Sequence, residues 1–423
     1  MLPGVGPRDG TRRVAIVAGC RTPFAKSGTV FRDVLAVDLA RHAGRELLER
    51  TNIDPREVDE VIFGQVVASP LVPNIAREVS LLPQLPKEVP AYTVNRACAS
   101  SGQAVSNAAD QIVRGHADVI LAGGVESLSD IPILHSHRMA QILTELSKAK
   151  SLGARLGTLA KIRPRDLIPV SPAIAEPSTG ETMGQSAEKM AKENGITREA
   201  QDQWALRSHR LSAQGTADGR LTAEIVPWLP TDGGAPIVSD NGIRTDTTLE
   251  QMAKLKPVFD RRYGSVTAAN SSPLTDGASA VLLMSEDAAG ALGYRPLAYL
   301  RSYAVAAVDP GWQLLQGPLW AVPKALERAG ITWGELGLLE VHEAFAAQVL
   351  SNFKGWSEKG WDVNPDIINV MGGSIAIGHP FGATGGRVIT TLANEMNRRD
   401  VQFGLVSICA QGGMAFACVL ERI

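Results

Sequence analysis

Short apolar runs alternate along this chain with longer, helix-like stretches that mix apolar and polar residues. The runs "ADVILAGG" (117–124) and "FGLVSICAQGG" (403–413) end in glycine and predict buried strands. A helix-like run precedes each of them. Strands that alternate with helices in this way indicate α/β units around a mostly parallel sheet.

The pattern also repeats weakly. The segment "LERTNIDPREVDEVIFGQ" (48–65) aligns without gaps with "LERAGITWGELGLLEVHE" (326–343). Both predict the end of a helix, a short turn around Ile53 or Ile331, and an apolar strand. After each we expect a second strand, a glycine- or serine-rich turn ("NRACASSGQAV" or "GHPFGATGGRV"), a helix and a further apolar strand. A repeat of this length indicates a duplicated domain, not a solenoid.

Residues 128–273, between the two copies, differ from them in composition and pattern. They hold many prolines and short charged helices such as "GQSAEKMAKENG" and "REAQDQWALRSHR". A segment of this length cannot be one loop of a compact domain. We therefore predict an N-terminal half at 1–127 that is completed by 274–296, an inserted loop domain at 128–273, and a C-terminal half at 297–423.

Composition limits the classes of function. A chain of 423 residues is too long for one ordinary core, and 44% hydrophobic and 20% charged residues are ordinary for a globular protein. The formal net charge of −2 gives no overall attraction to nucleic acid or to an anionic membrane. We expect no membrane span, and the N-terminal "MLPGVGPRDGTRR" lacks the apolar region of a signal peptide.

Cysteine is used sparingly. Cys20, Cys98, Cys409 and Cys418 are too widely spaced for a disulfide framework or a metal-binding pair, which fits a reducing, cytoplasmic setting. In "YTVNRACASSGQAVSNAAD" (92–110), Cys98 stands between a strand-like and a helix-like run. A helix that begins there would lower the thiol pKa from its reference of about 8.5 and expose the sulfur. A buried structural cysteine accounts for the position equally well.

Two further segments carry candidate chemistry. In "GGSIAIGHPFGATGG" (372–386), His379 occupies the turn that corresponds, by the repeat, to the Cys98 turn. Duplication would bring the two turns together at the ends of the sheets, where α/β proteins bind ligands. In "CAQGGMAFAC" (409–418), Cys409 ends a strand beside glycines, which suits proton transfer. We interpret Cys20 and Cys418 as structural.

The segment "EVHEAFAAQ" (340–348) places His342 and Glu343 at a strand end. It does not match the zinc signature HExxH, so we expect no metal site there. Two polar side chains at this place can instead position a water molecule or an oxyanion.

Taken together, these residues resemble the thiolase family over essentially the whole chain. The Cys98 segment, "GGVESLS" (123–129), "ANSSPLTDGASAVLL" (269–283), "HEAFA", "GHPFGATGG" and "CAQGG" follow the family's order. The HEAF sequence, together with "GQVV…PNIARE" (64–78), is most similar to the β subunit of the fatty-acid oxidation trifunctional complex. The resemblance implies a 3-ketoacyl-CoA thiolase of five layers, αβαβα, from two duplicated halves with an inserted loop domain.

The resemblance also implies roles. Cys98 would be the acyl-accepting nucleophile, His379 its base, and Cys409 the acid and base for the enolate and for incoming CoA. Backbone N–H groups of Cys98 and near Gln411 would hold the thioester oxygen, and His379 with His342 the enolate oxygen. Two residues depart from the family's pattern: Gln411 stands where glycine is common, which narrows the pocket, and His342 replaces the usual asparagine.

CoA is implied as a substrate, with no metal or redox cofactor. The inserted loop domain would bind it, and the CoA-binding positions map to Met183, Arg244, Phe259, Ser272, Leu274 and Phe345. Arg244 fits a phosphate, although a solvated surface charge explains it as well. We expect a homo-oligomer, either a dimer or a tetramer.

Residues 137–165 form a basic, amphipathic stretch. It fits a docking surface for a hydratase/dehydrogenase partner subunit or for a membrane, and also an ordinary helical hairpin. Two other functions stay open: an acetoacetyl-CoA thiolase that runs in the biosynthetic direction, and a non-catalytic scaffold or lipid-carrier subunit. Intact Cys98, His379 and Cys409 argue against the scaffold. Chain-length preference and physiological direction do not follow from the sequence.

Overall fold

The computed structural model describes residues 12–170, 175–231 and 233–423. The expectation about a signal peptide falls on residues 1–11 and lies outside this part of the chain. One half of the strand path runs β4 (Ala91–Val94), β3 (Glu60–Gly64), β5 (Val119–Glu126), β6 (Thr275–Ser285) and β1 (Val14–Arg21). The other half runs β7 (Ala298–Ala307), β10 (Met414–Glu421), β9 (Phe403–Ala410) and β8 (Leu338–Val341).

The two halves of this path meet between β1 and β7. Only Ala15–Tyr299 and Ile16–Ala298 are paired there, so the path behaves as two sheets joined at one corner. The short β2 (Ala25–Lys26) pairs with β6 off the main path. Among the named strands of the described ranges, the parallel pairs are β3–β4, β3–β5 and β8–β9. The prediction of a mostly parallel sheet was wrong, because the strands that complete each half return antiparallel, as β10 does after a tight turn.

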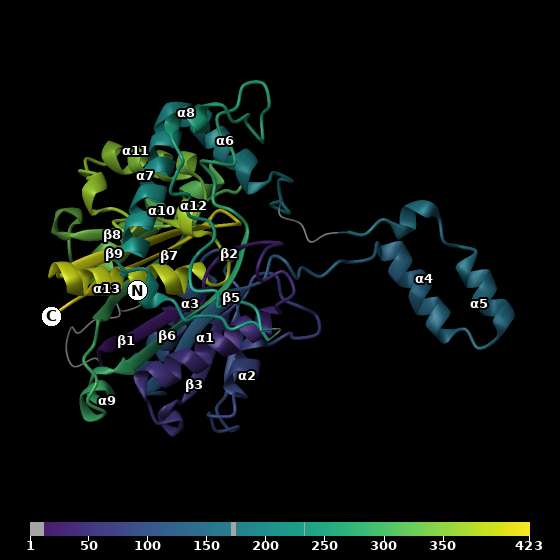
Figure 1. The fold of residues 1–423 in the computed structure, drawn as a ribbon, viewed down its shortest axis with the longest axis horizontal. Helices are drawn as coiled ribbons and strands as arrows, with labels where there is room; N and C mark the ends of the chain where they lie inside the picture. Colours follow the sequence, from purple (N-terminus) through teal and green to yellow (C-terminus); the bar gives the residue numbers. More distant parts are fainter. Residues whose placement is uncertain (1–11, 171–174, 232) are drawn as a thin grey trace.

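Side-chain alternation along the strands builds the layers. On β6, Leu283 belongs to the central core and Leu282 to an outer core, because successive strand residues point to opposite faces. The central layer holds α3 (Ser100–Val113) and α13 (Thr384–Arg399). Outside them lie α1 (Ala36–Thr51) and α2 (Ile75–Ser80) on the first sheet, and α10 (Pro318–Ala329) and α11 (Ala346–Glu358) on the second. The predicted five layers are confirmed (Figure 1).

The internal repeat is visible turn by turn. The aligned residues Asn52 and Gly330 both end a helix in the left-handed region, with φ of 51° and 71°. Single 3-10 turns then cover Pro55–Glu57 and Trp333–Glu335, and β3 and β8 follow at the same spacing. One expected element differs: where the first copy has β4, the second has only an isolated bridge between Leu339 and Ile368.

The N-termini of α3 and α13 lie against each other at the centre of the molecule. A Cβ on Gly385 would lie 2.4 Å from the backbone nitrogen of Gly102. The N–H of Gly386 also donates to the hydroxyl of Ser101, at 2.9 Å. Glycine is therefore required where the two copies meet, and the contact brings the turns before the two helices together.

The inserted segment has two parts. The helices α4 (His137–Lys148) and α5 (Leu152–Leu159) form a hairpin that projects away from the body (Figure 1). The helices α6 (Met183–Asn194) and α7 (Arg198–Ala217) contact α11, and α7 also contacts α8 (Leu249–Ala253) and the short α12 (Ser374–Ile377). The remaining helix, α9 (Glu286–Ala291), follows β6. Within the described residues, no helix is both long and apolar enough to cross a membrane.

Candidate active site

Cys98 lies in a tightly fixed turn immediately before α3. The preceding Ala97 has φ of 45°, which is uncommon for a residue with a side chain. Its N–H donates to the Asn95 side chain at 2.9 Å, and the Ser100 hydroxyl accepts from the Arg96 N–H at 2.9 Å. Short polar side chains thus close the turn locally, which fixes the position of the Cys98 sulfur.

The Cys98 thiol is partly buried and neutral at rest. Burial raises its pKa to about 12, and the backbone N–H groups of Gln411 and of Cys98 itself only partly offset this. The predicted lowering of this pKa was therefore wrong. The helix dipole acts only over the first turn and is outweighed by the loss of solvation around the sulfur.

His379 is buried beside Cys98. Its Nδ1 lies 2.7 Å from the hydroxyl of Thr384, the first residue of α13, while its Nε2 has no hydrogen-bond partner among the described residues. Burial, and then the nearby Arg387 cation, lower the imidazole pKa to about 3. His379 is therefore a neutral imidazole with one free nitrogen.

His342 follows β8 and faces His379, with the ring centroids 4.1 Å apart. Its Nδ1 lies 3.0 Å from the Ser374 hydroxyl, and its buried Nε2 has no partner in the described part of the chain. Burial, His379 and Arg387 lower its pKa well below the usual range. Ligand atoms of Cys98, His342 and His379 all lie within 4.8 Å of one another, so the structure brings the two predicted turns to one point.

Cys409 is buried at the end of β9, and its surroundings join it to the same site. Burial and then the proximity of Cys98 raise its thiol pKa well above the usual value. In the following turn, Gly412 has φ of 84° and donates its N–H to Glu176 at 2.9 Å. The side-chain amide of Gln411 donates to the Ala175 carbonyl at 3.1 Å. The inserted segment thus holds the turn that places the Gln411 N–H beside Cys98.

Glu343 does not join His342 in the site. Its carboxylate accepts from Trp204 at 3.0 Å, from Ser208 at 2.8 Å and from the Asn369 side chain at 2.8 Å. Consecutive residues of an extended segment point to opposite sides, which separates Glu343 from His342. Glu343 instead ties α7 to the loop before α12, so the expectation that it positions a water molecule or an oxyanion was wrong. For His342 that role stays a prediction.

Three of the proposed CoA-binding residues gather beside Cys409. Met183, Phe259 and Phe345 are partly buried against one core cluster that contains Cys409. The rings of Phe259 and Phe345 meet edge to face, with centroids 6.1 Å apart. Phe259 also covers Gly184, where a Cβ would lie 1.9 Å from the ring. This apolar wall has the character of a ligand-binding surface.

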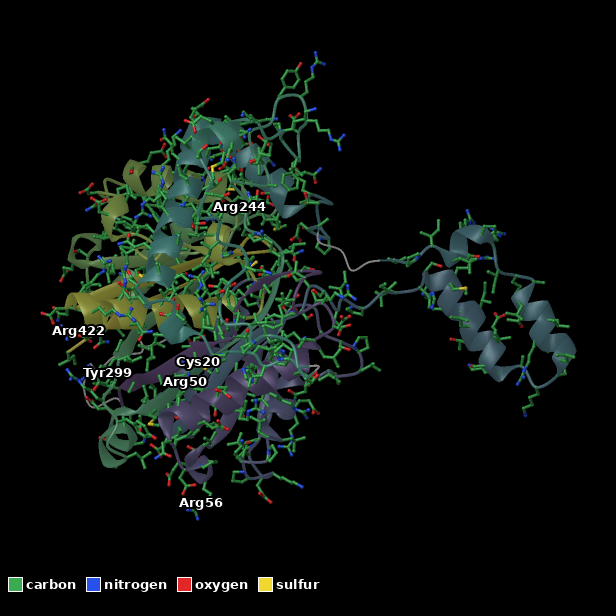
Figure 2. All side chains as sticks on the ribbon, in the orientation of Figure 1. Cys20, Arg50, Arg56, Arg244, Tyr299 and Arg422 are labelled. Carbon is green, nitrogen blue, oxygen red and sulfur yellow. The ribbon has the colours of Figure 1, made fainter. Side chains whose placement is uncertain are left out.

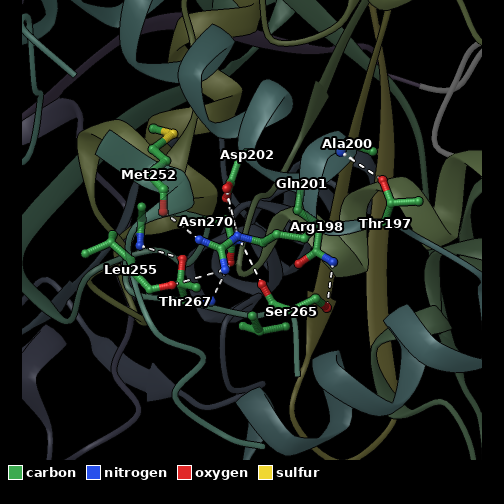
Figure 3. A network of polar contacts seen from close by, with 12 residues as sticks. Thr197, Arg198, Ala200, Gln201, Asp202, Met252, Leu255, Ser265, Thr267 and Asn270 are labelled. Atoms are coloured by element: carbon green, nitrogen blue, oxygen red, sulfur yellow. Dashed lines mark hydrogen bonds and ion pairs between the residues drawn. The ribbon is translucent and has the colours of Figure 1, made fainter. Parts of the chain in front are cut away.

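The loop before β6 carries Ser272 and Leu274. The Ser272 N–H donates to the Ala344 carbonyl at 2.9 Å, and Leu274, which is 44% exposed, forms a bridge with His379. The loop is fixed by Asn270, whose side chain bonds Asp202 at 2.9 Å and the Thr267 N–H at 2.8 Å (Figure 3). The buried Asp202 carboxylate on α7 therefore positions this edge of the site through Asn270.

Arg244 lies on the body of the molecule, apart from the hairpin (Figure 2). Its backbone N–H donates to His209 at 3.2 Å. Burial and then the positive charges of Arg244 and Lys26 lower the His209 pKa to about 4. Within the described ranges, neither Arg244 nor Lys26 has a carboxylate partner, so this region has uncompensated positive charge.

Sequence reasoning missed Ser374, Thr384, Arg387 and Glu176. The first three lie in or next to the glycine-rich stretch 372–386, which we interpreted from its glycines and from His379 and not from its hydroxyl groups. Cys20 and Cys418, interpreted as structural, are both buried, and Cys20 belongs to a different core cluster from the one that Cys98 packs against. Cys20 bonds the Ala43 carbonyl at 3.4 Å, and it lies in the N-terminal half near Arg50 (Figure 2).

The family model described as the N-terminal domain of thiolase matches residues 14–287, and that of the C-terminal domain matches residues 294–422. Relatives named 3-ketoacyl-CoA thiolase include that of Aeromonas salmonicida, 50% identical over 97% of both chains, and that of Cronobacter sakazakii, 49% identical over 97% of both.

Two solved structures are also similar. The Bacillus anthracis acetyl-CoA acetyltransferase has a TM-score of 0.87 at 34% identity, over 98% of this chain and 100% of the other. The human mitochondrial 3-ketoacyl-CoA thiolase has a TM-score of 0.84 at 33% identity, over 97% of this chain and 98% of the other.

Proposed function

The chain belongs to the thiolase family and is an acyltransferase, and from this premise we propose that it is a 3-ketoacyl-CoA thiolase of fatty-acid β-oxidation. Such an enzyme uses CoA to cleave a 3-ketoacyl-CoA into acetyl-CoA and a shortened acyl-CoA. The observation that carries the proposal is the convergence of Cys98, His342 and His379, whose ligand atoms lie within 4.8 Å of one another.

The first half-reaction begins with the Cys98 thiol. Its pKa of about 12 and the His379 pKa of about 3 leave both groups neutral at rest. Proton transfer to the free Nε2 of His379 must therefore accompany attack of the sulfur on the substrate's C3 carbonyl. The C2–C3 bond then breaks, and its electron pair becomes the enolate of acetyl-CoA.

The enolate oxygen needs a hydrogen-bond donor, and the unpartnered, buried Nε2 of His342 faces the same point. Cys409 protonates the enolate carbon. In the second half-reaction the Cys409 thiolate takes the proton of incoming CoA, whose sulfur attacks the Cys98 thioester. Backbone N–H groups of Cys98 and Gln411, which already stabilise the Cys98 sulfur, fit the thioester oxygen.

CoA would lie along the apolar wall of Met183, Phe259 and Phe345, with Ser272 and Leu274 at its edge. The uncompensated charge at Arg244 fits a CoA phosphate. Arg244→Ala should raise the KM for CoA with little change in kcat, because a phosphate contact holds ground state and transition state equally. An unchanged KM would remove Arg244 from the site.

The test of the proposal is to find the acyl group. Brief incubation with a 3-ketoacyl-CoA should leave an acyl group on the Cys98 peptide in mass spectrometry, and Cys20→Ser protein, altered at a buried thiol away from the site, should show the same label. An acyl group on Cys409 would contradict the assignment of roles.

Two other functions are separated by one assay. An acetoacetyl-CoA thiolase that works in the biosynthetic direction would cleave only the shortest ketoacyl-CoA efficiently, whereas a β-oxidation enzyme should cleave longer ones. A scaffold or lipid-carrier subunit would cleave none. CoA-dependent cleavage of several chain lengths by the purified protein alone distinguishes the three.

We also infer a homo-oligomer, at least a dimer. The edge strand β4 pairs only with β3 in the described part of the sheet, and its side chains are half-buried. An unpaired edge of this kind invites pairing with a second copy. Light scattering at micromolar concentration should therefore give a dimer or a tetramer, and a monomer would contradict this.

Four free thiols, two of them catalytic in this proposal, support a reducing, cytoplasmic location.

We propose that the α4–α5 hairpin docks on an anionic membrane surface. Leu152, Leu156 and Leu159 recur on one face of α5 and are 75%, 58% and 43% exposed. Residues 137–165 hold seven lysines and arginines and one acidic residue, against a net charge of −2 for the whole chain. An exposed apolar stripe with surrounding positive charge is typical of interfacial helices.

Vesicle flotation tests this surface. The full-length protein should float with phosphatidylglycerol vesicles, and Leu152→Ser/Leu156→Ser should sink while it keeps full thiolysis activity. Leu71→Ser, at a single leucine that is 92% exposed, is the matched control and should float. Failure of the unaltered protein to bind vesicles would contradict the proposal and leave a hydratase/dehydrogenase subunit as the partner to test.

A further inference from the structure

We propose that residues in the first turn of α13 hold the two site histidines in opposite tautomers. Arg387 of this turn acts on His342 through Ser374 of α12, and Thr384 acts on His379 directly. His342 then carries its proton on Nε2 and acts as a donor, whereas His379 carries its proton on Nδ1 and presents a lone pair on Nε2. The chemical use of these tautomers rests on the function proposed above, but the tautomers themselves follow from hydrogen bonding alone.

The donor tautomer of His342 follows from Ser374, which is fully buried. The Ser374 hydroxyl has two partners, the Arg387 Nη2 at 2.8 Å and the His342 Nδ1 at 3.0 Å. A guanidinium can only donate, so the Ser374 oxygen accepts from Arg387. Among the described residues the buried Ser374 hydrogen has no acceptor other than the Nδ1 of His342, so it is donated there. A neutral imidazole that accepts at Nδ1 must carry its proton on Nε2.

The acceptor tautomer of His379 follows from Thr384, which is also fully buried. The Thr384 hydroxyl donates to the Pro380 carbonyl at 3.0 Å, which leaves its oxygen to accept from the His379 Nδ1 at 2.7 Å. The free Nε2 of His379 therefore holds a lone pair, as a base for the Cys98 thiol requires.

Arg387 can hold its place because it is itself supported. Its side chain is 1% exposed, and its Nη1 lies 3.4 Å from the Glu340 carboxylate, which is equally buried. Glu340 lies on β8, two residues before His342, so the same segment carries the histidine and the carboxyl group that contacts Arg387. Burial and then the Arg387 cation keep both imidazoles neutral, which is the protonation state that tautomers require.

Opposite tautomers give the site one acceptor and one donor. The His379 lone pair can take the Cys98 proton, while the His342 N–H can bond an enolate oxygen that is present only after the C2–C3 bond breaks. The same assignment disfavours a metal ion among Cys98, His342 and His379, although their ligand atoms lie within 4.8 Å of one another. A metal needs a lone pair on each ligand, and the Nε2 of His342 has none in this tautomer.

Nitrogen NMR of the full-length protein labelled at histidine tests the tautomers directly. His342→Asn and His379→Asn assign the two rings. The unaltered protein should show a protonated Nε2 on His342 and a protonated Nδ1 on His379. In Ser374→Ala the His342 signals should shift toward a mixture of tautomers, and Ser374→Thr, which keeps the hydroxyl, should restore them. A protonated Nδ1 on His342, or no change in Ser374→Ala, would overturn the proposal.

Kinetics separates a positioning role from a structural one. Ser374→Ala should lower thiolysis kcat by roughly tenfold or more, below the roughly 10²–10³-fold cost of removing an oxyanion donor altogether. Acylation of Cys98 from a simple acyl-CoA should not change, because that step forms no enolate. Ser302→Ala is the control. It removes another buried serine hydroxyl, which lies on β7 and donates to the Ala325 carbonyl at 2.7 Å, and it should change neither rate. Equal loss of both half-reactions in Ser374→Ala would overturn the positioning role.

The tautomers and the proposed function can fail separately. If the unaltered protein shows the expected tautomers but cleaves no ketoacyl-CoA, the function is wrong and the tautomer assignment stands. If it cleaves ketoacyl-CoA with His342 protonated on Nδ1, the assignment is wrong and the function stands.

Discussion

The turn before α3 and the turn before α13 occupy the same place in the duplicated unit, but they carry different chemistry. The first holds Cys98, fixed by the positive φ of Ala97. The second holds His379, fixed by Thr384. His342 and Cys409 also come from the second copy. In the proposed function this difference separates tasks: one copy would supply the group that bonds to the substrate, and the other the groups that move protons or hold charge.

Both turns share one physical environment, which acts on their groups in opposite directions. Burial raises the pKa of the Cys98 thiol to about 12 and, with Arg387, lowers that of His379 to about 3. Desolvation always disfavours the charged form, so the acid becomes weaker and so does the base. Cys98 and His379 therefore both rest neutral, and charge develops on them only when substrate is present.

Among the changes to the two turns, removal of the Cys98 nucleophile should lower the reaction rates most. Cys98→Ser replaces the thiol with a hydroxyl of much higher pKa, so both Cys98 acylation and thiolysis should fall by roughly 10⁴-fold or more. Initial rates with a 3-ketoacyl-CoA measure this. Cys20→Ser is the control and should stay within about twofold of the unaltered protein. Thiolysis that survives in Cys98→Ser would place the nucleophile elsewhere.

The pH dependence of Cys98 alkylation tests whether the thiol is neutral at rest. A thiol with a pKa of about 12 is almost wholly protonated at neutral pH. Iodoacetamide reacts with the thiolate, so its rate at Cys98 should rise about tenfold per pH unit from pH 6 to 10, without levelling off. Peptide mass spectrometry follows the reaction at this residue. A plateau between pH 7 and 9 would show a thiol activated at rest and contradict the neutral resting site.

The contact between the two copies can be broken with a single methyl group. Gly385→Ala would place a Cβ 2.4 Å from the Gly102 backbone nitrogen, so α3 and α13 must move apart. We expect a loss of about 1–3 kcal/mol in the free energy of unfolding, by denaturant titration, together with reduced thiolysis.

Gly290→Ala is the matched control for that change. It adds the same methyl group in α9, where no atom lies within 4 Å, and should stabilise the protein by up to about 1 kcal/mol. If the two variants behaved alike, the close approach of the two helices would not matter.

Much of this arrangement could be predicted from the sequence, because the aligned residues of the two copies form the same local turns. Asn52 and Gly330 end aligned helices, and the spacing to β3 and β8 follows from them. The period of two along a strand could also have separated His342 from Glu343, although it was not applied to that pair.

Other features depend on contacts between distant segments. The Cys98 pKa is set by burial under both copies, which a helix-start motif cannot reveal. Ser374 and Arg387 matter only because the fold brings them to His342. The antiparallel return of β10 depends on the tight turn after Cys409, where the neighbouring glycines were interpreted only as suiting proton transfer.

The division of labour between the two thiols is tested most directly by measuring both half-reactions in Cys409→Ser. The variant keeps the shape of the side chain but cannot exchange a proton near neutral pH, so thiolysis should fall by roughly 10²–10⁴-fold. Acylation of Cys98 from a simple acyl-CoA reverses the CoA step, but CoA leaves readily as a thiolate and the Cys98 proton goes to His379. This acylation should therefore fall much less than thiolysis. If folded Cys409→Ser lost acylation as completely as Cys98→Ser does, the two thiols would not divide the work between the copies, and the account would be contradicted.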